Sequence, residues 1–476
     1  MTLKARITAI DRFIKGCKED GIYDDLNACC VMAGWASLAG ALTPLKGDAP
    51  TNNGFLAADF DRGIGLKGNG SSKYLDSNRA NNADGQDNHH SSVFVSSPTV
   101  SGGPGFDRYL GVYETALTPS TATNFYQTSD GSYAGSSRNN VTPIQGTATG
   151  VGIAGISRSS PSSFVMRIAG STHASGSVPS YTPSALDVFV FCGNLNGSPW
   201  RHTNARFAFY SIGSATDLAL LDARVSTLMA DLRAIEETGF DRDAIAYIRA
   251  VEEADGAYLE TSVKVAINNL VSGLKAESLW DAIGSSCLLS GPRTLAGALV
   301  PLRGDAPTPY GFVSGDHSRT DGLRDPGGTS YLNTNVRDDD YPQDDFHMAG
   351  YSTASGTYML SSYNSSALSG GGANIFLCRT STPFYSPTNT VGFSGLTRSE
   401  SSRYFVRKQS TTGERVEASN EPVDLPIYAF CRSDAAGNPA ATTAIGIAFY
   451  SIGTSLDLAK LDTHVSAYVT AIGAAI

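Results

Sequence analysis

The chain of 476 residues contains one segment that is written twice. Residues 38–51 read LAGALTPLKGDAPT and residues 295–308 read LAGALVPLRGDAPT, so twelve of the fourteen positions are identical. Such identity at a spacing of 257 residues indicates a tandem duplication. Whatever fold the first half adopts, the second half is expected to build again.

The repeat extends in both directions from this segment. Residues 13–14 match 270–271 and residues 75–90 match 332–347 at the same offset, whereas the hexapeptide AFYSIG recurs at an offset of 240, from Ala208 and Ala448. The second copy is therefore 17 residues shorter between His90 and Gly152, and a deletion of that size belongs in surface loops. A repeat of about 220 residues exceeds a solenoid unit, so we expect each copy to hold its own core.

The composition is that of a turn-rich β protein. Charged residues make up 17% of the chain, glycine accounts for 50 residues, and 41% of the residues are apolar, which excludes a disordered chain. The net charge of −10 and the absence of any Lys/Arg run longer than two residues argue against nucleic acid as a partner.

The first residues, MTLKARITAIDRFIKG, lack an apolar run long enough for a secretory signal or a membrane span. We therefore expect no membrane insertion, and synthesis and folding in the cytoplasm. The seven cysteines include the matched positions Cys30 with Cys287 and Cys192 with Cys431, in apolar surroundings and without zinc-site spacing. They are expected to be reduced and buried.

Each copy is expected to begin and end with a helix. Apolar residues step by three and four at the start of each copy, and a hydroxyl followed by a carboxylate opens the last helix at Asp217 and again at Asp457. The apolar stripes of the first and last helices comprise Ile7, Ile10, Ile14 and Cys17; Ile267, Leu270, Val271 and Leu274; Leu218, Leu221, Val225, Leu228 and Leu232; and Leu458, Leu461, Val465, Tyr468 and Ile472.

Between the helices lie short apolar segments bounded by Gly, Asn, Ser and Pro, which is typical of strands. The fold class we predict is mainly β, with two tandem jelly-roll β-sandwich domains, each flanked by a leading and a closing α-helix. The predicted domains are residues 1–235 and 258–476. Residues 236–257 have helical spacing at Ile245, Ile248 and Val251 and are predicted to form a helical connector.

Two stretches resemble known families. Residues 65–76, GLKGNGSSKYLD, resemble the opening hairpin of laminin-G-like (concanavalin A-like) jelly-roll domains. Residues 247–308, the Gly-rich region after them and the AFYSIG hexapeptide with its closing helix are similar to a module of virion structural proteins of tailed bacteriophages. The resemblance implies a virion component assembled in the host cytoplasm, with other virion proteins as partners and a symmetric homo-oligomer as its form.

Laminin-G-like domains often hold calcium at the loop rim, which draws attention to carboxylates in the matched loops. Carboxylates from several loops suit a hard cation, but the EF-hand spacing is absent and loop carboxylates are commonly solvated. We assign no metal or other cofactor, and the matched pairs Asp87/Asp344 and His90/His347 favour loop hydrogen bonds or a strand-edge ion pair. The metal candidates are Asp84, Asp87, His90, Asp344 and His347, with Asp338, Asp339, Asp340 and Asp345 beside them.

Cell-surface glycan is a possible partner because sugar sites combine exposed aromatic rings with Asp or Asn. Tyr113, Tyr126 and Tyr133 lie in the region that differs between the copies, although most aromatics there are expected to be core residues. Arg158 and Arg398 match between the copies and are expected to be buried arginines that brace a loop.

The sequence contains no GxSxG, HExxH or P-loop motif, so we expect that the chain is not an enzyme. The function predicted is a non-enzymatic structural protein of a phage virion, in the tail or a fibre, with lectin-like domains for host-surface glycan. The alternatives are a capsid decoration protein, a polysaccharide-degrading enzyme and a binding module outside any virion.

Overall fold

The computed structural model describes residues 3–99, 107–140, 143–147, 150–174, 177–369, 375–385 and 391–476. The chain is mainly β, and its strands form several largely antiparallel sheets. It divides into two compact units, of which unit 1 comprises Met1–Thr238 with Gly256–Thr261, and unit 2 comprises Gly239–Asp255 with Ser262–Ile476. Among the described residues no helix has the length and apolarity needed to cross a membrane.

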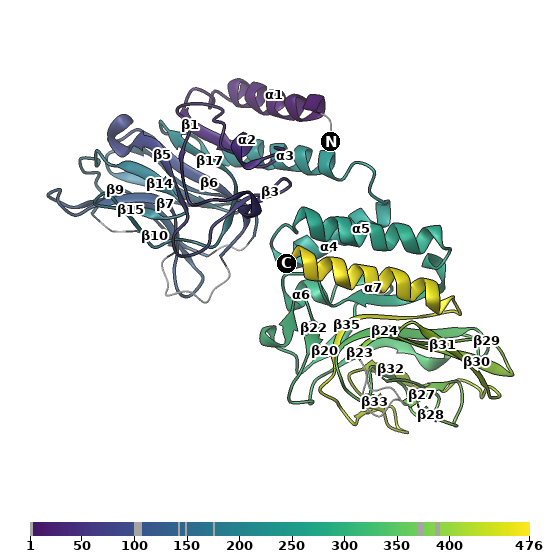
Figure 1. Cartoon of the computed structure of the whole chain (residues 1–476). Coiled ribbons are helices and arrows are strands. Elements are labelled where there is room, and N and C mark those ends of the chain that lie inside the picture. The colour runs from purple at the N-terminus through teal and green to yellow at the C-terminus, as the bar shows by residue number, and fades with distance from the viewer. Residues whose placement is uncertain are drawn as a thin grey trace. The chain divides into compact units, whose positions relative to one another are not determined.

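Unit 1 has three layers (Figure 1). Helices α1 (Leu3–Glu19) and α3 (Leu218–Glu236) lie side by side against the first sheet, which we call the helix-side sheet, through a cluster that contains Phe13, Phe209 and Leu221. The opposite face of that sheet meets a second sheet, the outer sheet, across the main core. The short helix α2 (Leu38–Ala41) is capped by Ser37.

In the described part of unit 1, the helix-side sheet has eight strands and the outer sheet nine. The helix-side strands are β1 (Leu26–Val31), β3 (Phe60–Asp61), β4 (Gly65–Lys67), β6 (His89–Ser97), β11 (Gly152–Ser160), β12 (Ser163–Ile168), β13 (Ser171–Ala174) and β17 (Arg206–Gly213). The outer strands are β2 (Thr51–Asn53), β5 (Tyr74–Ala80), β7 (Asp107–Glu114), β8 (Thr121–Gln127), β9 (Tyr133–Asn139), β10 (Ile144–Gly146), β14 (Asp187–Val190), β15 (Gly193–Leu195) and β16 (Ser198–Trp200).

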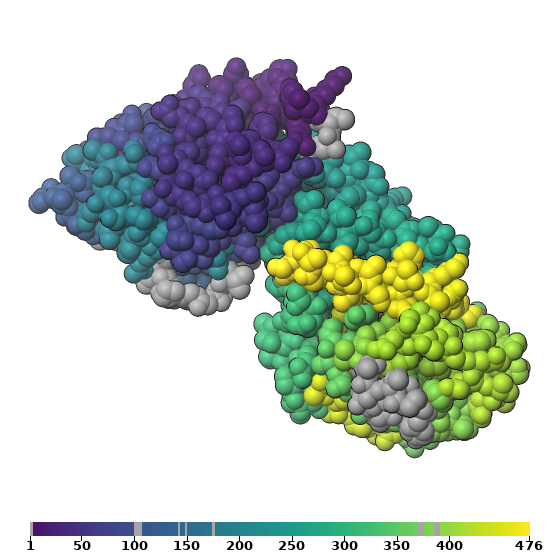
Figure 2. Space-filling model, viewed as in Figure 1, coloured from purple at the N-terminus to yellow at the C-terminus, as the bar shows by residue number. Residues whose placement is uncertain are grey.

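Unit 2 repeats this layered plan. Helices α5 (Thr261–Ala276) and α7 (Leu458–Ala475) lie side by side beside its helix-side sheet, and α7 forms a continuous ridge on the surface of the unit (Figures 1 and 2). The core between the two sheets contains Met348 and Tyr450 from the helix-side sheet and Leu360 and Phe376 from the outer sheet. The two-sheet arrangement is therefore present in both units, and the jelly-roll topology stays a prediction.

The described helix-side strands of unit 2 are β18 (Ile283–Leu288), β19 (Pro301–Arg303), β21 (His317–Ser318), β22 (Gly322–Arg324), β24 (Phe346–Ala354), β29 (Gly392–Glu400), β30 (Arg403–Lys408), β31 (Thr411–Val416) and β35 (Gly446–Gly453). The outer strands are β20 (Thr308–Tyr310), β23 (Tyr331–Arg337), β25 (Leu360–Ser361), β26 (Ser366–Leu368), β27 (Ile375–Cys378), β28 (Phe384–Tyr385) and β32 (Pro426–Ala429). The strands β33 (Arg432–Ser433) and β34 (Pro439–Ala440) form a separate hairpin.

The expected connector contains helix α4 (Arg242–Asp255), which confirms the helical spacing. Its contacts place α4 in unit 2, where it packs on the short helix α6 (Leu295–Ala298). Ala244, Ile248 and Val251 of α4 are buried. The helix is therefore part of the packed structure of unit 2.

The duplication is visible in the strand register and in matched polar contacts. Cys30 pairs with Tyr210 across β1 and β17, and Cys287 pairs with Tyr450 across β18 and β35. The part-buried ion pair between Arg167 Nε and Asp222 Oδ2, at 2.8 Å, recurs at 2.8 Å between Arg407 Nε and Asp462 Oδ2. All seven cysteines are buried and free, as predicted.

Candidate functional site

The outer sheet of unit 1 carries a cluster of aromatic and arginine side chains, which we call the aromatic–arginine cluster. It consists of Arg108 and Tyr113 on β7, Tyr126 on β8, Trp200 on β16 and Arg201 directly after β16. The three aromatic side chains are half-buried, Arg201 is exposed, and Arg108 is 8% exposed. These residues come from three segments that lie far apart in the sequence.

Arg108 lies among the aromatic rings of this cluster. Its guanidinium carbon lies 3.6 Å from the centre of the Tyr126 ring and 4.8 Å from that of Trp200. Arg201 lies 4.6 Å over the Trp200 ring, and the rings of Tyr113 and Trp200 are 6.5 Å apart. Such contacts stabilise each cation through the negative face of the ring. They also hold the rings in a fixed arrangement.

The local strand geometry explains why Arg108 points away from the core. A β-bulge between Arg108 and Leu110 breaks the alternation of β7, so Tyr109 enters the core while Arg108 lies opposite Tyr126 on the outer face. Trp200 is brought to the same place by the β15–β16 hairpin, whose turn residues Asn196 and Gly197 both have positive φ. An Asn-Gly turn is well suited to that conformation.

Burial lowers the pKa of Arg108 to about 10, which leaves the side chain charged at neutral pH. Its Nε and Nη1 atoms have no hydrogen-bond partner among the described residues. The nearby strand β8 presents Asn124, which is 3% exposed and whose Oδ1 is also without a partner there. Among the described residues, the outer sheet therefore contains a buried cation and an amide oxygen with hydrogen-bonding atoms that no described residue satisfies.

Unit 2 builds a related cluster from different positions. Arg432 on β33 lies 6.0 Å from the ring centre of Tyr358 and 5.7 Å from that of Tyr363. The matched Cys192 and Cys431 are 239 residues apart, and at that offset Arg432 corresponds to Gly193 on β15. The two copies therefore supply the arginine from different strands. The clusters differ in composition and in distances, and we treat the one in unit 1 as the candidate site.

The structure gives the metal candidates of unit 1 other partners. Asp84 accepts hydrogen bonds from Arg79 and Asn27, and Asp87 pairs with the Ser180 hydroxyl. His90 is buried, with Nδ1 2.5 Å from the Ser214 carbonyl oxygen and Nε2 2.9 Å from the Ser211 hydroxyl.

His347 of the second copy has hydrogen-bond partners that match those of His90. Its Nδ1 lies 2.6 Å from the Thr454 carbonyl oxygen and its Nε2 lies 2.8 Å from the Ser451 hydroxyl. Asp344 has a buried Oδ1 that no described residue contacts through a hydrogen bond, and the neighbouring Asp345 accepts one from the Ser455 amide. Across the described ranges, no group of three or more His, Cys, Asp or Glu is arranged to hold a metal ion.

The aromatic and arginine residues that the sequence singled out lie partly in the core and partly at the surface. Tyr133 is 3% exposed and packs in the main core, whereas Tyr113 and Tyr126 belong to the aromatic–arginine cluster. Arg158 and Arg398 are fully buried and donate to backbone carbonyls, as expected for loop-bracing arginines. Sequence reasoning missed Arg108, Trp200 and Arg201, for which the short Asn-Gly hairpin before Trp200 was the available signal.

No family model and no curated protein matches this chain. Similar solved structures include a variant of the NanB sialidase from Streptococcus pneumoniae, at 10% identity and a TM-score of 0.26, covering 34% of this chain and 27% of that one. They also include the tailspike protein 2 of Escherichia coli O157:H7 bacteriophage CAB120, at 12% identity and a TM-score of 0.24, covering 40% and 26%.

Domains LG4-5 of the mouse laminin alpha1 chain are similar at 8% identity and a TM-score of 0.22, covering 79% of this chain and 85% of that one. The chain spans well under two thirds of the sialidase and of the tailspike. With TM-scores this low, the likenesses place the chain in no family.

One expectation is corrected by these comparisons. We expected that the chain is not an enzyme, because its sequence lacks catalytic motifs. Sialidases, which are enzymes, stand among the similar structures, so that exclusion was wrong. The absence of a sequence motif was insufficient ground, since catalytic carboxylates can converge from distant loops.

Proposed function

We propose that the chain is a structural component of a tailed-bacteriophage particle, in the tail or a fibre, and that unit 1 binds host-surface glycan through its outer sheet. The observation that carries the glycan proposal is the aromatic–arginine cluster. The phage assignment rests on the resemblance of residues 247–308, and of the repeated AFYSIG hexapeptide with its closing helix, to virion modules.

The chemistry of the cluster suits a sugar. The half-exposed rings of Tyr113, Tyr126 and Trp200 offer apolar surface for the C–H face of a pyranose, together with hydroxyl and indole N–H donors. Arg201, which is exposed beside Trp200, offers a planar set of donors to hydroxyl or carboxylate oxygens. Acidic glycans combine both requirements, so they are the class we expect to bind most tightly.

The test is a glycan array probed with the full chain and with Trp200→Ala. We expect the variant to bind its preferred glycan at least about tenfold more weakly, because a central aromatic ring is a typical hot spot. Leu220→Ala is the matched control, since Leu220 is 39% exposed on α3, on the helix layer of the same unit. Equal loss in both variants, or no glycan bound by the full chain, would refute the proposal.

Two further measurements complete this test. The bound glycans are incubated with the chain and analysed for hydrolysis, which decides whether binding is accompanied by catalysis. Immunogold or cryo-EM localisation on the intact particle then distinguishes the positions: label on the tail or a fibre supports host recognition, and label on the capsid lattice would make the chain a decoration protein.

A further inference from the structure

Helix α1 presents an apolar stripe to solvent. The stripe consists of Leu3, Ile7, Ile10 and Ile14, whose spacing of four, three and four places them on one side of the helix. Leu3 is 65% exposed and Ile7 is 57% exposed, while Ile10 and Ile14 are half-buried. Figure 2 shows α1 at the surface of unit 1. We call these four residues the α1 stripe.

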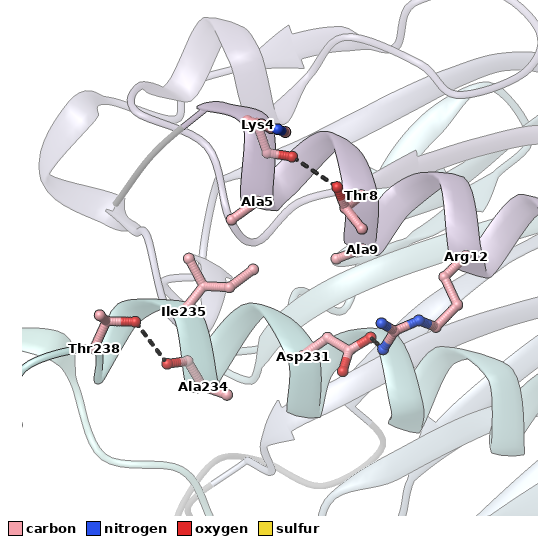
Figure 3. A pocket seen from close by; sticks show the side chains of 9 residues that line it. All are labelled: Lys4, Ala5, Thr8, Ala9, Arg12, Asp231, Ala234, Ile235 and Thr238. Carbon is pink, nitrogen blue, oxygen red and sulfur yellow. Dashed lines mark hydrogen bonds and ion pairs between the residues drawn. The ribbon is translucent and has the colours of Figure 1, made fainter.

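The α1 stripe is separate from the contact between α1 and α3. That contact uses a different side of α1, where Ala5, Thr8 and Arg12 face α3 across a shallow pocket (Figure 3). Arg12 Nη1 lies 2.7 Å from Asp231 Oδ2 there. In helical projection the α1 stripe lies on the flank of α1 that is turned away from this ion pair.

The second copy shows what covers the equivalent flank. At the offset of 257 residues, Ile7, Ile10 and Ile14 correspond to Lys264, Ile267 and Val271 on α5. Lys264 is 3% exposed, and Ile267 and Val271 are fully buried. In unit 1, Ile7 is therefore exposed, and Ile10 and Ile14 pack against the helix-layer core but keep part of their surface open. The three matched positions of unit 2 are closed.

Helix α4 lies along this flank of α5, and ion pairs join the two helices near both ends of α4. Lys264 Nζ lies 3.2 Å from Glu252 Oε1. At the N-terminal end of α4, Lys275 Nζ lies 2.7 Å from Asp241 and 2.5 Å from Asp243. These three pairs fix α4 along α5.

The far end of α4 is held by α6. Asp255 accepts hydrogen bonds from the Thr294 amide at 2.8 Å and from the Thr294 hydroxyl at 2.7 Å, and a side chain at Gly297 would collide with Asp255. The matched residues of unit 1 are Ser37, which is exposed, and Gly40, which is half-buried. Unit 1 therefore has small residues at the two positions that contact the C-terminal end of α4 in unit 2.

We propose that the α1 stripe is the docking site for an amphipathic helix of a different protein, oriented as α4 is on α5. The matched positions specify that helix. Lys18 corresponds to Lys275, so we expect the partner helix to carry a carboxylate in its first turn. Ser37 corresponds to Thr294, so we expect a second carboxylate in the last turn of the partner helix. Ile7 stands where unit 2 has Lys264, so the partner carries an apolar residue where α4 has Glu252.

The probe is a pair of labelled peptides that span residues 240–257, one with the natural sequence and one with Glu252→Leu. Each is titrated against the full chain and against the Ile7→Lys and Ile7→Glu variants. We expect the Leu peptide to bind the full chain more tightly than the natural peptide by about tenfold or more, because Ile7 cannot pair with a buried glutamate. Ile7→Lys should reverse that preference, and Ile7→Glu should abolish binding of both peptides.

Leu220→Lys is the control, because it places the same charge on α3 at an exposed apolar position outside the stripe. Its thermal unfolding and that of the Ile7 variants should match the parent chain, since both side chains are exposed. Absence of saturable binding, or binding that the Ile7 variants leave unchanged, would overturn the proposal. Self-association of the chain that Ile7→Glu dissolves would also overturn it, by making a second copy the occupant.

Discussion

His90 should make unit 1 sensitive to acid. The imidazole is fully buried, and burial lowers its pKa from the usual 6.5 to about 4 despite the hydrogen bond to the Ser214 carbonyl. Because a carbonyl oxygen only accepts, Nδ1 carries the proton and Nε2 accepts from the Ser211 hydroxyl. The folded state therefore requires the neutral ring.

The sign of the effect follows from this lowered pKa. Between pH 6.5 and pH 4 the unfolded chain binds a proton at His90 and the folded chain does not, so the free energy of unfolding falls as the pH falls. Above pH 6.5 the contribution is fully retained. Lowering the pH from 7.5 to 5 should cost about 2 kcal/mol through this one group.

The perturbation is His90→Gln, which removes the titration. At pH 7.5 the variant should be less stable than the parent by about 1–3 kcal/mol, since one buried hydrogen bond or more is lost. At pH 5 that gap should be smaller by about 2 kcal/mol, because only the parent loses stability through His90.

The assay is a urea titration at each pH, with unfolding of unit 1 followed by hydrogen-exchange mass spectrometry of peptides from β6. His347→Gln should show the same pH dependence for β24 in unit 2, because burial lowers the pKa of His347 to about 4 as well. A stability gap that is constant from pH 7.5 to pH 5 would refute the reasoning, since it would mean that His90 titrates equally in both states.

Three further predictions concern stability and reactivity. Arg398→Leu should destabilise unit 2 by about 3 kcal/mol or more in urea denaturation, because the carbonyl of Cys378 and four other backbone carbonyls lose their buried donor. An effect below about 1 kcal/mol would contradict this role. Gly453→Ala should also destabilise unit 2, since the added Cβ would collide with the Ala282 carbonyl oxygen. Gly473→Ala in α7 has open space around the added Cβ and should raise the stability of unit 2 by up to about 1 kcal/mol. Thermal unfolding compares the two variants, and equal effects would be inconsistent with this packing. All seven buried thiols should resist a thiol reagent in the native chain and react after denaturation, and rapid native labelling would disprove their burial.

Much of the local structure was predictable because it depends on short-range patterns. Asp217 and Asp457 accept hydrogen bonds from the first amides of α3 and α7, as their position before an apolar periodic stretch indicated. The periodicity at Ile245 and Ile248 likewise predicted α4. A helix of this kind is specified by neighbours three and four residues away.

The aromatic–arginine cluster could not be predicted in the same way. Arg108, Tyr126 and Trp200 meet because β7 pairs with β8 and because the β15–β16 hairpin runs beside β7. Sequence alternation assigns a side chain to a face of its strand but does not specify which strands become neighbours. The bulge at Arg108 also reverses the face that simple alternation would give.

By itself the sequence determined that this protein is a duplication, with two cores, matched helix caps and buried cysteines, because each of these features is written in composition or in short-range spacing. Tertiary structure alone decided that α4 packs on α5 and leaves the matched flank of α1 open. Ile10 and Ile14 match Ile267 and Val271, which are equally apolar, yet only the α5 pair is fully buried, because burial depends on whether another element packs against the helix. Tertiary structure also decided that Tyr133 is a core residue while Tyr126 is half-buried at the surface, since the burial of each ring depends on the pairing of distant strands.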